Sequence, residues 1–382
     1  MIWVDTQEDF DRTMARVADE PVVAIDTEAD SLHSYFDKVC LVQISIPHED
    51  FVIDPLAKID LARFGEILAE PSIVKIFHGG DYDVRILNRD FGFTITNLID
   101  TMISAQILGY EAFGLAALLD RHFGLKLNKA NQRADWAMRP LRPDMLDYAA
   151  TDTRHLIKLR DILKDELEVL GRWPWALEEF ARLEAVRYRE KEEDDPEPFR
   201  RLKGIGAYDR RGLGVIRALY NWRDELARAA DRPPFKIIGN DVILELGKEQ
   251  PRSRDDLSRV KSLSRFHHGR YGGEIVKIVR SALEIPEDQL PERGEPKSWI
   301  RDKALEARVD RLKKVRDRLA AELKIDVAVL APRHVLTAVA AIQPTEVAQL
   351  DAIPAMREWQ KKLLGEPFIA ALATPAQNAK LF

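Results

Sequence analysis

The stretch PVVAIDTEAD, residues 21–30, places two carboxylates directly after a run of apolar residues. Its four consecutive apolar residues, 22–25, are typical of a strand with both faces covered, as found in α/β domains. Because side chains alternate along a strand, Asp26 and Glu28 are expected on the same face with Cβ atoms roughly 6–7 Å apart. Two such anions repel each other unless a cation lies between them, although a polar turn at the end of the strand would also account for them.

The composition is that of a globular protein with two to three domains, since the chain has 382 residues, 46% of them hydrophobic and 32% charged. The only cysteine, Cys40, lies in the apolar stretch KVCLVQISI, so we expect no disulfide framework, no thiolate metal cluster and a cytoplasmic setting. We also expect no secretory signal and no membrane span, because the first residues are acidic and no apolar run is long enough. The net charge of −6 argues against a surface coated by nucleic acid but says nothing about local patches.

Residues 1 to about 165 mix strand and helix patterns. Short β-branched runs occur in PVVAID, KVCLVQISI, DFVIDP and SIVKIFH, and helical patterns fall between or after them. The polar segment IPHED, residues 46–50, separates two of these strands and predicts a hairpin. We therefore expect an α/β domain with a mixed sheet rather than a purely parallel one.

The strand signal almost disappears from about residue 144 onward. Residues 142–171 have apolar positions at helical spacing and end on Gly171. The charged run 189–200 and the Pro-, Glu- and Gly-rich run 285–299 predict boundaries between the first domain and two helical units. The loops KIIGNDVILEL and DVAVLAPRHVLTAV occupy similar places in these two units, which indicates a degenerate repeat.

Further acidic side chains of the first domain fall at a strand end or on one helical face. In IVKIFHGGDYDVRIL, Asp81 and Asp83 follow a second strand, at the edge where open α/β sheets bind ligands, although either aspartate could instead cap the next helix. In LDYAATDTRHL, Tyr148 and Asp152 are four residues apart and therefore share a helical face. Asp100, in LIDTMISAQILG, is as consistent with a helix cap as with a ligand.

This set of oxygen ligands without cysteine suits divalent Mg²⁺ or Mn²⁺ rather than zinc. Four carboxylates carry about four negative charges, which two divalent ions would balance. A pair of such ions about 3.5–4 Å apart supports in-line displacement at phosphorus. The residues therefore predict two-metal hydrolysis of a phosphodiester bond.

The three acidic motifs, in this order and spacing, resemble those of the DEDD 3′–5′ exonucleases, in the subgroup with tyrosine in its third motif. The stretch LNKANQRADWAMRPL, with Asp135 and Trp136, is similar to the segment before that motif in the ribonuclease D family. Residues 218–247 resemble the start of the helical HRDC domain of that family and of RecQ-type helicases. The resemblance covers residues 1–285, and residues 300–382 resemble a weaker second copy of the HRDC domain.

The family resemblance implies an architecture and a set of catalytic residues. The fold would be an α/β ribonuclease H-like exonuclease domain with a mixed sheet over residues 1–190, followed by two all-α HRDC-like helical bundles, residues 200–290 and a degenerate copy, 300–382. Five side chains would act in catalysis: Asp26, Glu28, Asp83, Tyr148 and Asp152. The four carboxylates would hold two metal ions, with Asp26 bridging both, and Tyr148 would orient the attacking water. Asp83 rather than Asp81 fits the family pattern, because it lies five residues after His78.

A basic segment in the first helical unit, residues 252–274, is a candidate for binding nucleic acid because it mixes cationic and aromatic side chains. The candidate residues are Arg252, Arg254, Arg259, Lys261, Arg265, Arg270 and Tyr271, with Phe266 among them. An ordinary solvated surface is equally consistent with this run of charges.

The resemblance also implies a metal-dependent 3′–5′ exoribonuclease that releases 5′-mononucleotides and trims the 3′ ends of tRNA precursors and other structured small RNAs. Its partner would be RNA with a free 3′ end, with no membrane and no obligate protein partner indicated. Since carboxylates do not read the 2′-hydroxyl, a 3′–5′ DNA exonuclease of the same chemistry is a second hypothesis. A third, a non-catalytic nucleic-acid-binding protein, is at odds with the presence of all four carboxylates and Tyr148.

Overall fold

The computed structural model describes residues 1–127, 131–189, 195–293 and 302–373 and divides the chain into two compact units. The first unit comprises Met1–Glu28, Val39–Tyr188 and Ile300–Phe382, and the second comprises Ala29–Lys38 and Arg189–Trp299. Parts of both predicted linkers, residues 190–194 and 294–299, lie outside the described residues. In the described ranges, no helix combines the length and the apolar character needed to cross a membrane.

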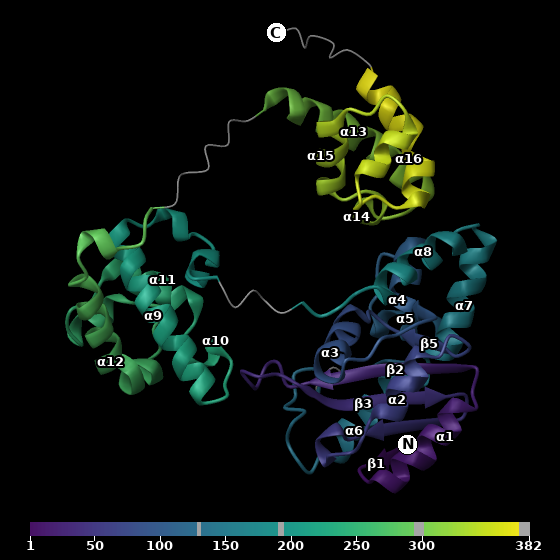
Figure 1. Ribbon diagram of the computed structural model, residues 1–382, viewed down its shortest axis with the longest axis horizontal. Helices are drawn as coiled ribbons and strands as arrows, with labels where there is room; N and C mark the ends of the chain where they lie inside the picture. Colours follow the sequence, from purple (N-terminus) through teal and green to yellow (C-terminus); the bar gives the residue numbers. More distant parts are fainter. Residues whose placement is uncertain (128–130, 190–194, 294–301, 374–382) are drawn as a thin grey trace. The chain divides into compact units, whose positions relative to one another are not determined.

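A six-stranded mixed sheet forms the centre of the first unit and confirms the predicted α/β class (Figure 1). Its strands are β1 (Ile2–Val4), β2 (Val22–Ala29), β3 (Val39–Ile46), β4 (Glu49–Ile53), β5 (Val74–Phe77) and β6 (Leu98–Asp100). They are arranged in the order β1-β4-β3-β2-β5-β6. β3 and β4 are antiparallel, whereas β1 is parallel to β4, and both β2 and β6 are parallel to β5. The strand that carries Asp26 and Glu28 therefore lies in the interior of the sheet.

The predicted hairpin is present, but its strands extend further into the turn than the sequence indicates. β3 and β4 pair up to Ile46 and Glu49, so the turn consists of Pro47 and His48 alone. The sequence does not predict the edge strands β1 and β6. Each has only three residues, which are too few to show the alternation of side chains that is typical of a strand.

Helices cover the sheet and bring distant segments to the end of β2. The helices of this domain are α1 (Gln7–Ala18), α2 (Ala62–Ala69), α3 (Asp81–Phe91), α4 (Thr101–Leu108), α5 (Leu115–Phe123), α6 (Pro143–Arg154), α7 (Leu156–Val169) and α8 (Trp173–Glu184). Residues 142–171, predicted as one helical stretch, form α6 and α7 with a break at His155. α6 packs on β3 and β4, while α7 packs on β5 and α8 on β6.

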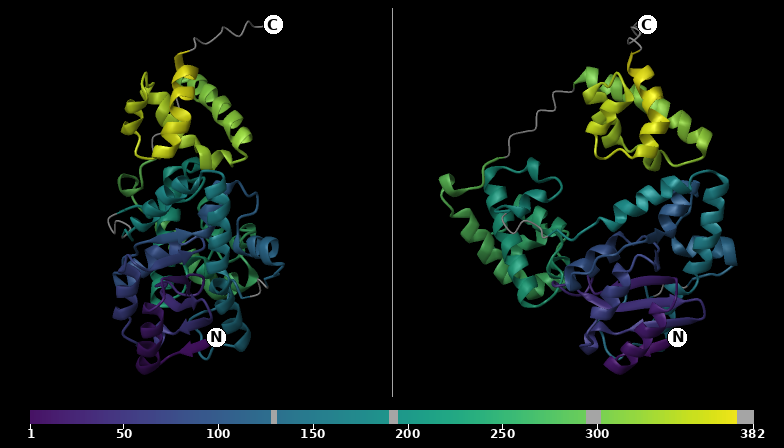
Figure 2. Two further views of the ribbon diagram at one scale, coloured as in Figure 1. Left: turned by 90° about the vertical axis from the view of Figure 1, so that its right-hand side faces the viewer. Right: turned by 45° about the vertical axis from the view of Figure 1, so that its right-hand side comes forward.

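Two helical bundles complete the described chain (Figure 2). Both have the same order of elements. The first contains α9 (Arg210–Ala229), α10 (Pro234–Ile237), α11 (Asn240–Glu249), a 3-10 turn at Asp255–Arg259 and α12 (Arg265–Leu283). The second contains α13 (Lys303–Leu323), α14 (Val327–Leu330), α15 (Arg333–Ile342), a 3-10 turn at Val347–Ala352 and α16 (Glu358–Ala373). A buried arginine on each long first helix donates to a carbonyl fifteen residues further on, Arg223 to Ile238 at 3.2 Å and Arg316 to Ala331 at 3.0 Å. The two bundles are therefore copies of one structural unit.

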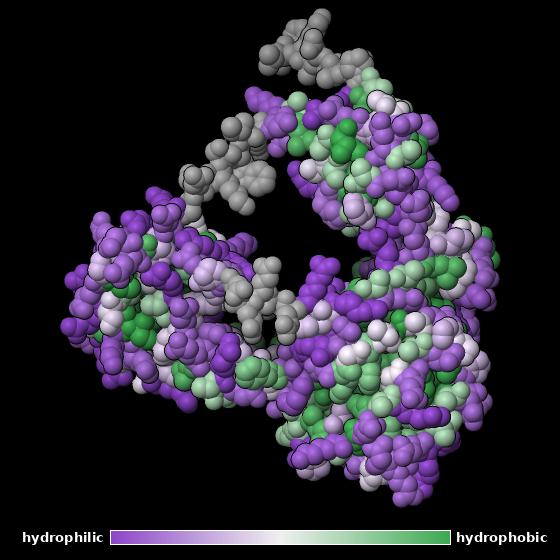
Figure 3. Space-filling model, in the orientation of Figure 1, coloured by the Kyte–Doolittle hydropathy of each residue, from purple (hydrophilic) through white to green (hydrophobic). Residues whose placement is uncertain are grey.

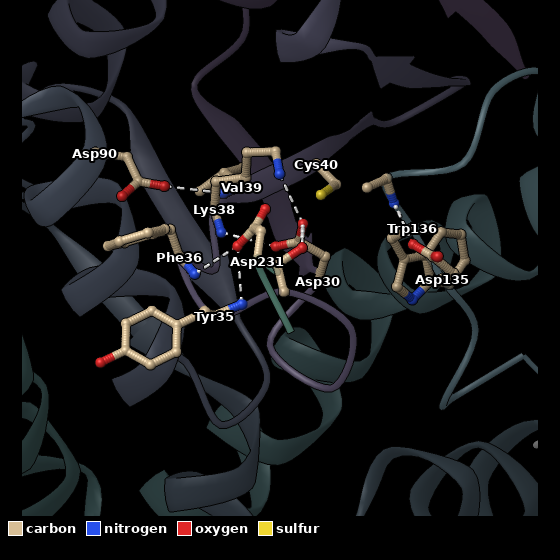
Figure 4. Close-up of polar contacts among 12 residues, drawn as sticks. Asp30, Tyr35, Phe36, Lys38, Val39, Cys40, Asp90, Asp135, Trp136 and Asp231 are labelled. Atoms are coloured by element: carbon tan, nitrogen blue, oxygen red, sulfur yellow. Dashed lines mark hydrogen bonds and ion pairs between the residues drawn. The ribbon is translucent and has the colours of Figure 1, made fainter. Parts of the chain in front are cut away.

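Loop 29–38, which leads from β2 to β3, belongs to the second unit. Figure 4 shows the contacts of Tyr35 and Phe36 in this loop with Asp231. The Asp231 carboxylate accepts the backbone N–H groups of Tyr35 and Phe36 at 3.0 and 3.1 Å. The Tyr35 hydroxyl donates to Asp224 on α9 at 3.0 Å. β2, which carries Asp26 and Glu28, is therefore followed directly by a loop that is bonded to the first helical bundle.

The second helical bundle packs against α8 within the first unit. The rings of Trp175 and Trp359 stack with their centroids 4.8 Å apart. The Arg357 guanidinium donates to both oxygens of Glu179, at 2.7 and 3.0 Å. The Glu178 carboxylate accepts the backbone N–H of Trp359 at 3.1 Å, in the first turn of α16. Charge-assisted bonds of this kind favour one fixed docking geometry.

Replacing Glu179 with Ala is expected to weaken the docking of α16 by about 1–3 kcal/mol, because the Arg357 side chain, only 23% exposed, would lose its paired carboxylate. Faster hydrogen exchange of the α16 amides measures this effect. Glu322→Ala is the matched control, since the pair of Glu322 with Arg318 is exposed and contributes less than about 1 kcal/mol. Equal protection of α16 in both variants would contradict the docking role of Glu179.

Candidate active site

Three carboxylates from two elements meet at the end of β2. Asp26 and Glu28 lie on β2 and Asp152 lies on α6, and one oxygen of each is within 4.8 Å of an oxygen of the other two. The side chains of Asp26 and Glu28 converge because residues two apart on a strand share a face. Asp152 joins them because α6 packs on β3, the neighbour of β2 in the sheet.

Asp83 completes the cluster from the first turn of α3. It is buried, and its Oδ1 accepts the backbone N–H and the hydroxyl of Thr27 at 3.0 and 2.5 Å. Thr27 is the residue between the two carboxylates of β2, so Asp83 is tied directly to that strand. Asp81, by contrast, is exposed and forms an ion pair with Arg85 at 2.8 Å. The structure therefore brings Asp83, and not Asp81, to the other three carboxylates.

The carboxylates of the cluster resist ionisation in the absence of a cation. Burial raises the pKa of Asp26 and of Glu28 well above the usual range, and the neighbouring carboxylates raise it further. Burial also raises the pKa of Asp83 to about 6 and that of Asp152 to about 7. A buried anion loses its hydration and repels like charges, and a bound cation would relieve both effects.

The donor set fits divalent cations. Among the described residues, none of the four carboxylates forms an ion pair with a lysine or arginine, so their charge is not balanced by the protein. Carboxylate oxygens are the ligands that Mg²⁺ and Mn²⁺ prefer. The arrangement can therefore hold divalent metal ions.

Tyr148 lies one turn before Asp152 on α6 and lines a cavity of about 390 Å³ together with Asp26, Asp152 and His78. Burial and, after it, the nearby carboxylates raise the pKa of Tyr148 above its usual range. The phenol therefore keeps its proton at neutral pH and can donate a hydrogen bond into the cavity. The Trp136 ring supports it, with the two ring centroids 6.0 Å apart.

The segment that holds Trp136 is fixed by an arginine that the sequence does not single out. Arg139 donates to both oxygens of Asp54, at 2.6 and 2.7 Å, and to the carbonyl of Trp136 at 2.8 Å. Trp136 itself is buried. Residues 128–130, at the start of the stretch that resembles the ribonuclease D family, lie outside the described residues.

Asp100 lies outside the carboxylate cluster and has a structural role. Its carboxylate accepts the N–H groups of Met102 and Ile103 at 2.8 and 3.0 Å, which caps α4. It also accepts those of Gly79 and Gly80, at 3.1 and 2.8 Å. This second pair of bonds fixes the turn between β5 and α3, which contains His78 and leads to Asp83 in the first turn of α3.

The basic segment of the first helical bundle is only partly available for binding. Its six cationic candidates are exposed: Arg252, Arg254, Arg259, Lys261, Arg265 and Arg270. Tyr271 is 8% exposed and packs edge-on against Trp222, with ring centroids 5.6 Å apart, so the structure contradicts a stacking role for this ring. Phe266, 66% exposed, is the aromatic side chain that remains accessible. Figure 3 shows a largely hydrophilic surface on the visible face of this bundle.

Two family models match the chain. The model described as 3′–5′ exonuclease matches residues 1–168, and the HRDC domain model matches residues 212–279 and 306–372. The two HRDC matches coincide with the two helical bundles and support the predicted repeat.

Curated relatives and solved structures are similar over most of the chain. Ribonuclease D of Gluconacetobacter diazotrophicus is 33% identical over 304 residues, which cover 78% of this chain and 76% of that protein. Ribonuclease D of Nitrobacter hamburgensis is 28% identical and covers 96% of this chain and 94% of the relative. The structure of Escherichia coli RNase D, described as an exoribonuclease involved in structured RNA processing, covers 97% of this chain and 98% of that chain at 25% identity, with a TM-score of 0.69. The catalytic core of RRP6 from Trypanosoma brucei is 32% identical, with a TM-score of 0.65, and covers 74% and 79% of the two chains.

Proposed function

Because the chain belongs to the ribonuclease D family and is a 3′–5′ exoribonuclease, we propose that the carboxylates of β2, α3 and α6 form its catalytic centre. The observation that carries this proposal is the approach of Asp26, Glu28 and Asp152 to within 4.8 Å of one another. Asp83 supports it through its bonds to Thr27. The proposed reaction is hydrolysis of the last phosphodiester bond of RNA, with release of a 5′-mononucleotide.

In this reaction the four carboxylates would hold two divalent ions, with Asp26 shared between them. The bound ions would supply Lewis acidity that activates water and neutralises charge on the leaving 3′ oxygen. Asp83 is kept in place by Thr27 and Asp152 by the packing of α6, so the ligands are oriented before substrate arrives. The protonated Tyr148 would donate a hydrogen bond that orients the attacking water.

We further propose Mg²⁺ or Mn²⁺ as the metal and 3′-extended tRNA precursors and other structured small RNAs as substrates. The description of the Escherichia coli structure supports structured RNA as the substrate class. The six exposed cationic side chains of residues 252–270 would contact phosphates of the RNA body. We retain residues 1–190, 200–290 and 300–382 as the proposed extents of the three domains. The relatives disfavour a DNA exonuclease, and the intact cluster disfavours a non-catalytic protein.

Incubation of a 3′-extended tRNA and its all-deoxy analogue with Mg²⁺, Mn²⁺ or EDTA tests this function. We expect release of mononucleotides from the RNA with either metal and none with EDTA, because the carboxylates alone cannot activate water. Chromatography of the products distinguishes 5′-mononucleotides from oligonucleotides. Preferential degradation of the DNA, or cleavage that persists in EDTA, would overturn the proposal.

A further inference from the structure

His78, the residue that follows β5, has a defined tautomer. Its Nδ1 lies 2.9 Å from the hydroxyl oxygen of Thr101, and that hydroxyl donates its single proton to the carbonyl of Phe77 at 3.1 Å. The hydroxyl must therefore accept from the histidine, so Nδ1 carries the ring proton. The other ring nitrogen, Nε2, is left with a lone pair and is a hydrogen-bond acceptor.

The surroundings of His78 hold the ring in this orientation. Thr101 is buried, and the Asp100 carboxylate fixes the glycine turn that follows His78 by accepting two of its N–H groups. Burial lowers the pKa of His78 to about 4, so the ring is neutral at physiological pH. In the described part of the chain, Nε2 has no hydrogen-bond partner, and His78 lines the same cavity as Asp26 and Tyr148. The cavity therefore contains a neutral acceptor that is not used by the protein.

The chemistry of RNA limits what this acceptor can bind. A phosphodiester has no proton to donate, whereas ribose hydroxyls and base amino groups do. An exonuclease removes successive nucleotides whose bases differ, so a donor that every substrate shares must come from the ribose. Cleavage of the last bond at the carboxylates also places the 3′-terminal nucleoside next to them, in a cavity of about 390 Å³.

We propose that Nε2 of His78 accepts a hydrogen bond from a hydroxyl of the 3′-terminal ribose, which makes His78 a residue that binds the terminal nucleoside and, where the donor is the 2′-hydroxyl, selects RNA ends. The inference rests on the proposed catalytic centre, because that centre places the terminal nucleoside in this cavity. The 2′- and 3′-hydroxyls share the required chemistry, and substrates that lack one or the other distinguish them.

Two substitutions test the acceptor at Nε2 independently of the rest of the His78 ring. His78→Asn keeps an N–H group near the position of Nδ1, for the bond to Thr101, but has no atom at the position of Nε2. His78→Gln places an amide oxygen near the position of Nε2 and restores an acceptor. We expect His78→Asn to lower kcat/KM on all-ribose RNA by roughly ten- to a hundredfold and His78→Gln to recover most of the loss.

A cycle of enzyme and substrate variants tests the pairing. Oligonucleotides ending in a ribonucleotide, a 2′-deoxynucleotide or a 3′-deoxynucleotide are assayed with wild type and both variants. Their affinities are also measured in EDTA, where no cleavage occurs. We expect the loss of kcat/KM in His78→Asn to disappear on the one substrate that lacks the partner hydroxyl. That substrate identifies the hydroxyl. The affinities in EDTA are expected to follow the same pattern.

An equal loss on all three ends would assign His78 a structural role and overturn the proposal, as would no loss on any of them. Failure of the proposed function is a separate result, since wild type would then release no nucleotide from RNA with Mg²⁺ or Mn²⁺. The affinities in EDTA still test the pairing in that case, because they do not depend on turnover.

Discussion

Asp26→Asn should abolish RNA hydrolysis while it stabilises the metal-free protein. A bound metal supplies several kcal/mol of transition-state stabilisation, and each 1.36 kcal/mol is about tenfold in rate, so loss of the ligand that we propose to be shared should cost roughly a thousandfold or more in kcat. In the metal-free protein, the charge of Asp26 is disfavoured by burial and by Asp83, Asp152 and Glu28, as its raised pKa indicates. A neutral amide of the same shape removes this repulsion. Single-turnover assays measure the rate, and thermal unfolding in EDTA measures a Tm increase of a few degrees.

The matched control is Asp81→Asn, on the same helix as Asp83 but outside the cluster. Asp81 has a side chain that is 62% exposed and pairs with Arg85 within its own helix, so its loss should cost less than about 1 kcal/mol and leave the rate unchanged. Turnover by Asp26→Asn close to that of wild type would refute the role of Asp26. A comparable loss in Asp81→Asn would show that the assay reports on α3 as a whole.

Local spacing in the sequence was enough to predict which side chains of two elements lie close together in the cluster. The alternation along β2 places Asp26 and Glu28 together, and helical spacing places Tyr148 near Asp152. For Asp83, local rules left a helix cap as an alternative, although a weaker one than for Asp81, and the family resemblance then favoured Asp83 over its neighbour. The long-range bond to Thr27 distinguishes the two aspartates, and no local pattern contains that bond.

Residues that act across long sequence separations could not be predicted in this way. Asp54 and Arg139 are 85 residues apart, and the pattern of neither segment indicates the other as its partner. Loop 29–38 likewise gives no sign that it belongs to the same unit as Asp231. Such pairings depend on the tertiary fold, which brings the two segments together.

The prediction that the Tyr271 ring stacks on nucleic acid is wrong for a reason that lies in its own helix. A mixture of basic and aromatic residues indicates nucleic-acid binding only if the aromatic side chains are exposed. Tyr271, Ile275 and Val279 recur every four residues on α12, and all three are buried. The helical periodicity therefore already indicated that the Tyr271 ring faces the core. At a position with this periodicity, the spacing is a better guide to exposure than the type of residue.

Raising the pH from 5 to 8 should destabilise the metal-free protein, and Mn²⁺ should reverse the effect. Asp83 and Asp152 have pKa values of about 6 and 7 in the folded protein, above the value near 4 of an unfolded aspartate. The folded state thus binds more protons between these values. Each such carboxylate lowers the free energy of unfolding by up to about 1.4 kcal/mol per pH unit until the pH passes its folded pKa. Thermal unfolding in EDTA and in Mn²⁺ across this range measures the difference.

The variant Asp152→Asn isolates one part of this dependence, because Asp152 has a pKa of about 7 and titrates at the upper end of the range. Its metal-free form should lose stability less steeply between pH 6 and 8 than wild type. Metal binding to wild type near pH 6 must also release protons, since the ions bind ionised carboxylates. Calorimetry in buffers of different ionisation enthalpy counts those protons. A pH-independent Tm in EDTA, or metal binding without proton release, would show that the cluster is already ionised and that its charge is balanced within the protein.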